Sequence, residues 1–169
     1  MATKAGAKRD AARDPAQAST TAPEAGAGAE MEAADAYRLD AQVGHLLRRA
    51  NQRHLSIFSD LIPDLTPRQF AALAKLQEGG PVSQNQLGRA TAMDAATIKG
   101  VIDRLAKREL VSTAPSPDDR RRLIVSLTPA GEALFASVAD AAFRATAATL
   151  APLDPDDRAQ LLRLLVRIS

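Results

Sequence analysis

The apolar residues between positions 39 and 108 recur at every third or fourth position, which is the spacing of helices that bury one face. The first run, Leu39–Leu61, predicts a helix of about six turns that ends before Pro63. Three shorter helices follow, and each is preceded by a residue that can cap a helix N-terminus. We expect them at 67–79, 84–90 and 95–108, capped by Thr66, Ser83 and Asp94.

The pattern changes from helix to strand after residue 109. Leu110–Thr113 and Leu123–Leu127 are short runs rich in branched residues and predict two strands. The segment 114–122 between them holds two prolines and a pair of aspartates, which cannot fill a central strand, so it is expected to be the loop of a β-hairpin. Thr128 then opens a long helix, and Asp154 opens a last helix that ends at Ile168.

This order of elements is typical of a winged helix-turn-helix, a mainly α fold with a small β-hairpin wing. We expect one domain over 37–169, with its DNA-binding part at 66–128. The helices in 37–62 and 129–169 carry more apolar surface than so small a module can cover. They are therefore expected to be dimerisation helices of a homodimer.

The first 36 residues have a different composition from the rest. They include 14 alanines and no Val, Leu, Ile, Phe, Tyr or Trp. Such a segment cannot bury enough surface to offset its chain entropy, so we expect 1–36 to be a disordered tail. The tail holds four of the 22 basic and six of the 20 acidic residues, which leaves 18 basic and 14 acidic residues for the domain. That excess is modest, so a nucleic-acid partner depends on where the charges lie.

Composition also excludes several classes of protein. The chain has no cysteine, which rules out disulfides, thiolate metal sites and cysteine nucleophiles, and its two histidines lack a metal-ligand spacing. It has neither a glycine-rich phosphate loop nor a nucleophile elbow, so we expect no enzyme, no cofactor and no metal. No apolar run is long enough for a membrane helix or a signal peptide, which predicts a cytoplasmic protein without a membrane partner.

The helix over 95–108 is the natural candidate to enter the DNA major groove. Its exposed N-terminal positions are small or polar, so they could approach base edges, while its later basic residues suit phosphate contacts. A solvated amphipathic helix remains the alternative. The candidate DNA-binding residues on this helix and at the start of the preceding one are Ser83, Gln84, Ala95, Ala96, Thr97, Lys99, Arg104 and Lys107.

Three consecutive arginines, Arg120, Arg121 and Arg122, stand in the predicted hairpin loop. Such a loop can place one guanidinium in a narrow minor groove while its neighbours bind phosphate. We expect Asp119 to brace one arginine through a bidentate ion pair. A solvated turn is the alternative.

Several motifs resemble the multiple-antibiotic-resistance regulator (MarR) family over about residues 38–168. They are Leu65–Phe70, Leu87–Arg89, Met93–Ile98, Ile102–Leu105, Asp119–Arg121 and Val125–Gly131. The resemblance implies an obligate homodimer that binds a palindromic operator, usually to repress, and it makes Arg121 the minor-groove residue. Glu109 departs from the pattern, because the family usually has glycine there. It is expected to take a left-handed conformation at a cost of ~1 kcal/mol.

The first predicted helix carries a second candidate site. Arg48 and His45 lie about 60° apart on a helical wheel, and Arg48 and His54 about 120° apart. The segment is similar to the sensing helix of family members that respond to aromatic carboxylates. The resemblance assigns Arg48 to the carboxylate and His54 to a ring hydroxyl or carbonyl. The aromatic ring of the ligand is expected to stack on Phe58, Phe70 or Tyr37. Salt bridges across the dimer, and packing for His45, are the alternatives. The candidate ligand residues are Arg48, His54, His45, Tyr37, Phe58 and Phe70.

The sequence therefore predicts a ligand-responsive DNA-binding transcriptional regulator. We expect a repressor that binds double-stranded operator DNA as a homodimer and is released by a small anionic aromatic ligand, such as a hydroxybenzoate or a nicotinate derivative. A winged-helix protein-interaction module without an operator, and a MarR-type activator, remain open. A steep fall of DNA affinity with salt would separate operator binding from protein binding. The operator, the regulated genes and the identity of the ligand are not fixed by the sequence.

Overall fold

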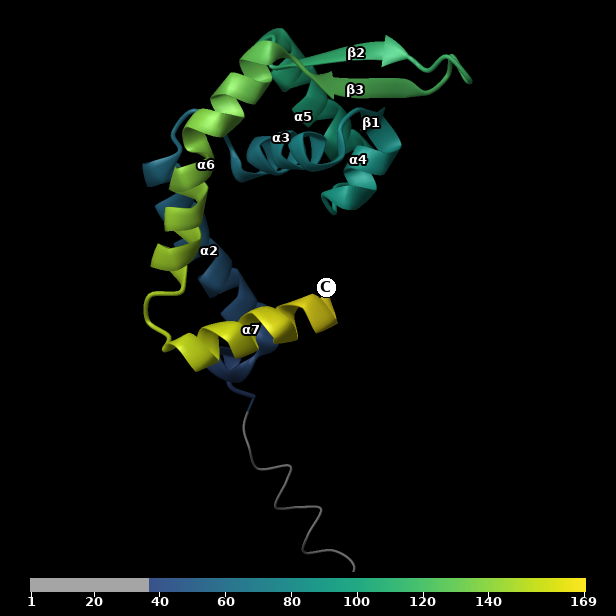
Figure 1. Cartoon of the computed structure of the whole chain (residues 1–169). Helices are drawn as coiled ribbons and strands as arrows, with labels where there is room; N and C mark the ends of the chain where they lie inside the picture. Colours follow the sequence, from purple (N-terminus) through teal and green to yellow (C-terminus); the bar gives the residue numbers. More distant parts are fainter. Residues whose placement is uncertain (1–36) are drawn as a thin grey trace, which may run out of the picture. The chain divides into compact units, whose positions relative to one another are not determined.

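The computed structural model describes residues 37–169, and the disorder predicted for 1–36 lies outside the described residues. The chain divides into two units, Met1–Leu39 and Asp40–Ser169. The second unit contains the helices α2 to α7 and the strands β1 to β3 (Figure 1). The predicted mainly α fold with a small β-hairpin wing is confirmed.

Two long helices, α2 (Val43–Leu61) and α6 (Pro129–Thr149), lie side by side, and α7 (Pro155–Ile168) follows after a short turn (Figure 1). The end of α2 at Leu61 is as predicted, but its start is four residues later than expected. A short 3-10 turn, Leu39–Ala41, precedes it, and the extended backbone of Gln42 separates the two.

The three short helices are α3 (Pro67–Gly79), α4 (Gln84–Ala90) and α5 (Ala95–Lys107), close to their predicted bounds. Each has the predicted cap. Thr66 and Ser83 form capping boxes, and the side chain of Asp94 accepts a hydrogen bond from the backbone N–H of Thr97 at 2.8 Å. These caps satisfy backbone donors that would otherwise lack partners in the first turn, which explains why short helices begin where the sequence predicts.

The wing belongs to a three-stranded antiparallel sheet with the order β1-β3-β2. The expected strands are β2 (Val111–Pro115) and β3 (Leu123–Leu127), but β1 (Val82–Ser83) was not predicted. It pairs Val82 with Val125, so its existence depends on a distant partner. The strand β2 continues to Pro115, inside the expected loop. It lies at the edge of the sheet, where proline is tolerated.

The connection between α5 and the sheet contains the predicted left-handed residue, because Glu109 has φ of 57°. Nearby, the Thr128 hydroxyl donates to the Glu109 carbonyl oxygen at 2.6 Å and accepts from the Gly131 N–H at 3.1 Å. A Cβ on Gly131 would collide with the Leu110 carbonyl oxygen. The Thr-Pro-x-Gly motif thus allows α6 to start directly against the connection between α5 and β2.

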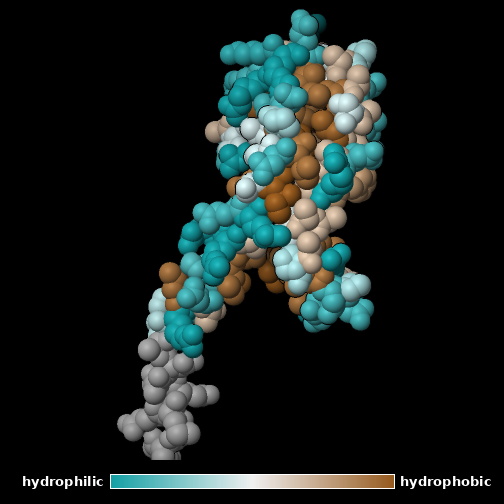
Figure 2. Space-filling view, turned by 90° about the vertical axis from the view of Figure 1, so that its left-hand side faces the viewer, coloured by the Kyte–Doolittle hydropathy of each residue, from teal (hydrophilic) through white to brown (hydrophobic). Residues whose placement is uncertain are grey.

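Burial is unevenly distributed over the second unit. The helices α3 to α5 and the sheet enclose a core that includes Leu73, Leu87, Ile98 and Leu105. In contrast, α2 buries Phe58 alone and α7 buries no residue. Figure 2 shows apolar side chains that reach the surface on one face of the molecule. The large exposed apolar residues of α2, α6 and α7 are Val43, Leu46, Leu47, Leu55, Phe143, Leu162, Leu164, Val166 and Ile168.

Candidate nucleic-acid interface and ligand cavity

The N-terminal part of α5 presents the predicted reader residues. Ala95, Ala96 and Lys99 are exposed, and Thr97 is half-buried. The ammonium of Lys99 pairs with the Asp103 carboxylate at 2.7 Å, so it would have to exchange this partner to reach DNA. Further along the helix, the predicted phosphate residues Arg104 and Lys107 are both exposed.

The cap of α5 is a charged one. Asp94 accepts from the backbone N–H and from the hydroxyl of Thr97, each at 2.8 Å. These two hydrogen bonds, the backbone one first, lower the pKa of the Asp94 carboxyl below its ordinary value of 3.8. The carboxylate form thereby holds the first turn of the candidate reader helix in place.

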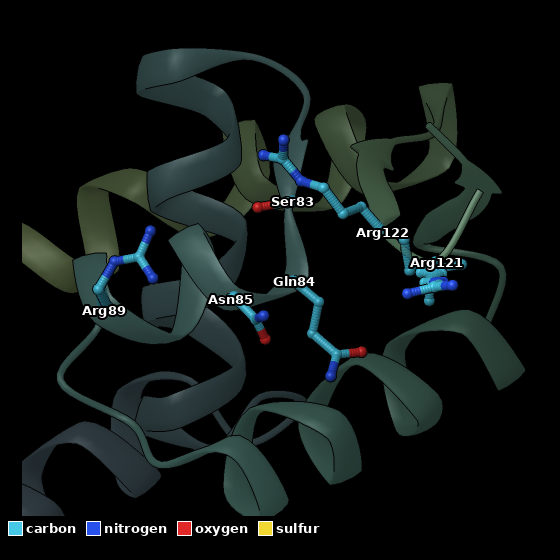
Figure 3. Close-up of a pocket in the computed structure, with 7 residues that line it drawn as sticks. Ser83, Gln84, Asn85, Arg89, Arg121 and Arg122 are labelled. Carbon is cyan, nitrogen blue, oxygen red and sulfur yellow. The ribbon is translucent and has the colours of Figure 1, made fainter. Parts of the chain in front are cut away.

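A groove of about 400 Å³ lies between the start of α4 and the wing (Figure 3). Arginines from both sides line it, and it has no carboxylate among its lining residues. Figure 3 shows Arg89 on the α4 side and Arg121 and Arg122 on the wing side. The groove is a site of positive potential of the kind that attracts phosphate. Its lining residues are Ser83, Gln84, Asn85, Arg89, Arg121, Arg122 and Leu123.

Two polar residues of this groove, Asn85 and Arg89, were not predicted as site residues, and neither was the apolar Leu123. Asn85 and Arg89 stand four positions apart, so they share one face of α4. The spacing of the two residues could have been recognised in the sequence. Only the three-dimensional structure shows that this face of α4 borders the wing. Ser83 was predicted to contact DNA, yet it is buried. Its hydroxyl serves the helix cap, because it accepts from the backbone N–H of Gln86 at 3.4 Å and donates to Gln86 Oε1 at 2.7 Å.

The wing loop is organised through its backbone. Asp119 Oδ1 accepts from the backbone N–H of Arg121 at 3.0 Å, and the Asp119 carbonyl oxygen accepts from that of Arg122 at 2.8 Å. The predicted bidentate pair between Asp119 and an arginine is therefore wrong. An exposed aspartate gains more from closing a local turn than from holding a long, solvated side chain. None of the ion pairs found within 37–169 involves Arg120, Arg121 or Arg122.

A polar cluster occupies the start of α2. Arg48 Nη2 lies 2.9 Å from His45 Nδ1, and His45 Nε2 lies 3.2 Å from Asp40 Oδ1. Since a guanidinium only donates, His45 Nδ1 accepts and its Nε2–H faces the carboxylate. Arg48 and Asp40 are exposed, whereas His45 is half-buried. His45 therefore orients Arg48 in this structure.

His54 lies two turns further along α2, on an apolar cavity of about 350 Å³ that is open to solvent and lined by α2, α6 and α7. The structure does not bring Arg48 into this cavity, although Leu47, the residue before it, is part of the wall. The predicted pair of Arg48 and His54 thus stands on the same helix but not at the same cavity wall. The lining residues are Leu47, Ala50, Asn51, His54, Thr146, Thr149, Leu150, Leu161, Leu162 and Leu165.

The aromatic residues predicted to stack on a ligand are placed differently from that expectation. Phe58 is 3% exposed and packs edge-on against Phe70, with ring centroids 5.7 Å apart. Phe70 in turn stacks on Phe135 at 5.6 Å. The prediction of a stacking surface at Phe58 is therefore wrong for this conformation, because the ring belongs to the core. Tyr37 is 78% exposed.

Two further features bear on the chemistry of the described part of the chain. Within 37–169, no group of three or more His, Asp or Glu side chains is arranged to hold a metal ion. No helix there has both the length and the apolar character needed to cross a bilayer.

The structure thus combines a candidate recognition helix, α5, a basic wing, and the helices α2, α6 and α7 with exposed apolar faces. These features define a winged helix-turn-helix DNA-binding protein. Residues 64–122 match the model of the MarR family. The chain is 44% identical over 131 residues to the HTH-type transcriptional repressor NicR of Pseudomonas putida, which covers 76% of this chain and 83% of NicR. The chain belongs to the MarR family.

Two solved structures are similar to this chain throughout its domain. A probable transcriptional regulator from Pseudomonas aeruginosa is 52% identical, with a TM-score of 0.76, and the match covers 78% of this chain and all of that one. BpsR of Bordetella bronchiseptica, whose DNA binding is regulated by 6-hydroxynicotinic acid, is 42% identical with a TM-score of 0.76, over 78% of this chain and 96% of BpsR. The predicted family is thereby confirmed.

Proposed function

We propose that this protein is a homodimeric transcriptional repressor that binds a palindromic operator and releases it when an aromatic carboxylate binds. The observation that carries the DNA-binding part is the basic groove between α4 and the wing. Three arginines from two elements converge on it, and no carboxylate among its lining residues offsets them. A structural role would not require such an uncompensated cluster, because like charges repel one another.

The DNA-binding proposal assigns different tasks to the two parts of this surface. The exposed tip of α5, with Ala95 and Ala96, would approach base edges in the major groove. Arg121 would enter the minor groove, while Arg89 and Arg122 would hold the backbone between the two grooves. Two modules related by a two-fold axis would then protect half-sites about one helical turn apart, ~10 bp from centre to centre.

The ligand proposal rests on the cavity beside His54. Its volume of about 350 Å³ is suited to a small molecule, and its wall is mostly apolar with one imidazole. Two proteins that resemble this chain support the choice of ligand and response. The DNA binding of BpsR is regulated by 6-hydroxynicotinic acid, and NicR is a transcriptional repressor. We therefore assign the ligand to hydroxylated nicotinate or benzoate acids, with His54 as the partner of the ring substituent. Arg48, which lies outside the cavity wall and contacts His45 in this structure, would leave His45 to become the partner of the carboxylate.

A shift assay on the DNA upstream of the gene tests both parts. We expect binding that weakens steeply between about 50 and 200 mM salt, since phosphate contacts release counterions. Addition of 6-hydroxynicotinic acid should lower the operator affinity by roughly 5- to 150-fold. Salt-insensitive binding, or the absence of any DNA complex, would favour a protein-interaction module instead.

Arg48→Ala should bind the operator normally but respond to the acid at far higher concentration or not at all, because it loses the bidentate carboxylate partner. The matched control is Arg49→Ala. Arg49 is the next residue on α2. Its guanidinium lies 3.9 Å from the Asp40 carboxylate, which also contacts His45. If both variants respond alike, Arg48 has no specific role in sensing.

A further inference from the structure

A chain of two hydrogen bonds connects His54 to the end of α6. His54 Nδ1 lies 3.0 Å from the hydroxyl oxygen of Thr149, and this hydroxyl lies 2.7 Å from the carbonyl oxygen of Ala145. Both His54 and Thr149 line the apolar cavity. The arrangement therefore touches the candidate ligand site directly.

The positions of the protons in this chain follow from the chemistry of the groups. A threonine hydroxyl has one proton, and the Ala145 carbonyl can only accept, so the Thr149 proton points to Ala145. Thr149 Oγ1 is then an acceptor toward the histidine, and His54 Nδ1 must carry its own proton. In the neutral ring, Nε2 is left as the acceptor.

His45, nine residues earlier on the same helix, has the opposite arrangement. Arg48 donates to its Nδ1, so its proton resides on Nε2, toward Asp40. The two histidines of the chain thus hold different tautomers, each determined by its partner. A tautomer that the partner determines can be changed by changing the partner.

We propose that Thr149 is a positioning residue that makes Nε2 of His54 a hydrogen-bond acceptor, so that the site selects aromatic acids with a ring O–H or N–H donor. This selectivity rests on the proposed ligand-responsive function. A ring without such a donor would offer Nε2 no hydrogen bond at the mostly apolar wall of the cavity. An acid with the donor would be favoured over the same acid without it by roughly 2- to 10-fold, the value of one hydrogen bond.

Arg53, the residue before His54 on α2, holds the end of α6 independently of the Thr149 hydroxyl, so this hydroxyl can be removed without loosening the two helices. Arg53 donates to the Ala148 carbonyl oxygen at 3.0 Å and to the Thr149 carbonyl oxygen at 3.3 Å. These bonds hold the end of α6 on α2 through the backbone and do not involve the Thr149 hydroxyl. Thr149→Val should therefore remove the hydrogen bond to His54 and keep the packing of the two helices.

The first measurement is imidazole ¹⁵N NMR of the ligand-free, full-length protein at pH about 8, where imidazole in model peptides is neutral. The chain has two histidines, so a His45→Gln variant assigns the signals. We expect a protonated Nδ1 for His54 in the wild type and in Thr149→Ser, which keeps the hydroxyl. In Thr149→Val we expect the proton to move wholly or partly to Nε2. A wild-type His54 protonated on Nε2, or an unchanged Thr149→Val spectrum, would overturn the proposal.

The second measurement compares operator release by 6-hydroxynicotinic acid and by nicotinic acid. The wild type and Thr149→Ser should prefer the hydroxylated acid, and Thr149→Val should lose this preference by roughly 2- to 10-fold with an unchanged response to nicotinic acid. Ser137→Ala is the control, since Ser137 is an exposed hydroxyl residue of α6 that bonds the Leu134 carbonyl. An equal shift for both acids would show a merely structural role for Thr149. If neither acid releases wild-type protein, the selectivity fails with the proposed function, while the NMR result still decides the tautomer.

Discussion

The winged module (residues 66–128) and the helical base (α2, α6 and α7) differ in how completely they are packed. The module encloses side chains such as Leu73, Leu87 and Leu105, each with an exposed fraction of 0%. In the base, α2 buries one residue, α6 buries only the small residues Gly131, Ala141 and Ala145, and α7 buries none. A helix that leaves a wide apolar face uncovered requires a partner, so we propose that a second chain completes the base and that the module needs none.

This difference separates the two proposed activities. The module carries the DNA-facing charge on a scaffold that depends on its own core and caps. The base carries the ligand cavity between α2, which packs along α6, and α7, which buries no residue. A ligand in the base can therefore change the spacing of two modules without unfolding either, which is what reciprocal coupling between ligand and operator requires.

The largest effect is expected from charges placed on the bare face of α7. Leu164 and Ile168 are one helical turn apart, 43% and 69% exposed, and neither lines the ligand cavity. In a monomer, Leu164→Asp with Ile168→Asp would change stability by no more than about 0.5 kcal/mol per site. In a dimer, the pair should cost about 3–6 kcal/mol of association and raise the dissociation constant more than ~100-fold.

Light scattering over a concentration series measures this effect. Ala114→Asp, on the exposed wing strand β2, is the control for an added charge. A double variant of α7 that stays dimeric at the concentrations where wild type does would place the interface elsewhere. If wild type proved to be a folded monomer, the exposed apolar face of the base would need no partner chain, and the base would not differ from the module in this respect.

The next effect concerns the module. Arg121→Ala should weaken operator binding by about 1–3 kcal/mol, or roughly 5- to 150-fold, because it removes a groove contact as well as a charge. Lys107→Ala should instead lower the salt slope by about one and weaken all sequences alike. Fluorescence anisotropy with operator and random duplexes separates the two. Arg163→Ala, an exposed arginine of α7, should have little effect on either. An Arg121 variant with wild-type affinity would contradict the role of the wing.

The sequence predicted the module better than the base, because most features of the module depend on residues close together in the chain. Helix periods, caps and the left-handed Glu109 depend on neighbours within a few residues, and these predictions are confirmed. The strand β1 was missed because two residues have no period of their own and pair with a strand far along the chain.

The candidate sites show the limit of local patterns more sharply. A helical wheel gives the direction of a side chain but not its depth or its partner. Phe58 was expected to stack on a ligand, whereas its ring is in the core. The helical wheel likewise did not show that Arg48 contacts His45 or that Arg89 faces the wing across a groove. These contacts depend on packing between separate elements.

A smaller effect tests the local strain at Glu109. Its φ of 57° lies in the region that favours glycine. Glu109→Gly should raise the free energy of unfolding by about 0.5–1 kcal/mol, measured by urea at fixed protein concentration. Ala136→Gly, at an exposed interior position of α6, should lower it by about 1 kcal/mol. Destabilisation in both variants would mean that the Glu109 side chain contributes more than its backbone costs.

The smallest effect is a pH dependence confined to the start of α5. The folded Asp94 carboxyl has a pKa below its ordinary value of 3.8, because Thr97 donates to it from both its backbone and its hydroxyl. The unfolded state therefore binds the proton more readily, so the stabilisation is fully present above pH about 4 and is lost as the pH falls through the folded pKa. Asp94→Asn keeps a capping side chain but does not titrate. Thermal melts should show wild type more stable than Asp94→Asn at pH 6, since a negative charge favours a helix N-terminus, with a difference that shrinks as the pH falls below about 4. A difference that stays constant with pH would mean that Asp94 acts through its shape alone and not through its charge.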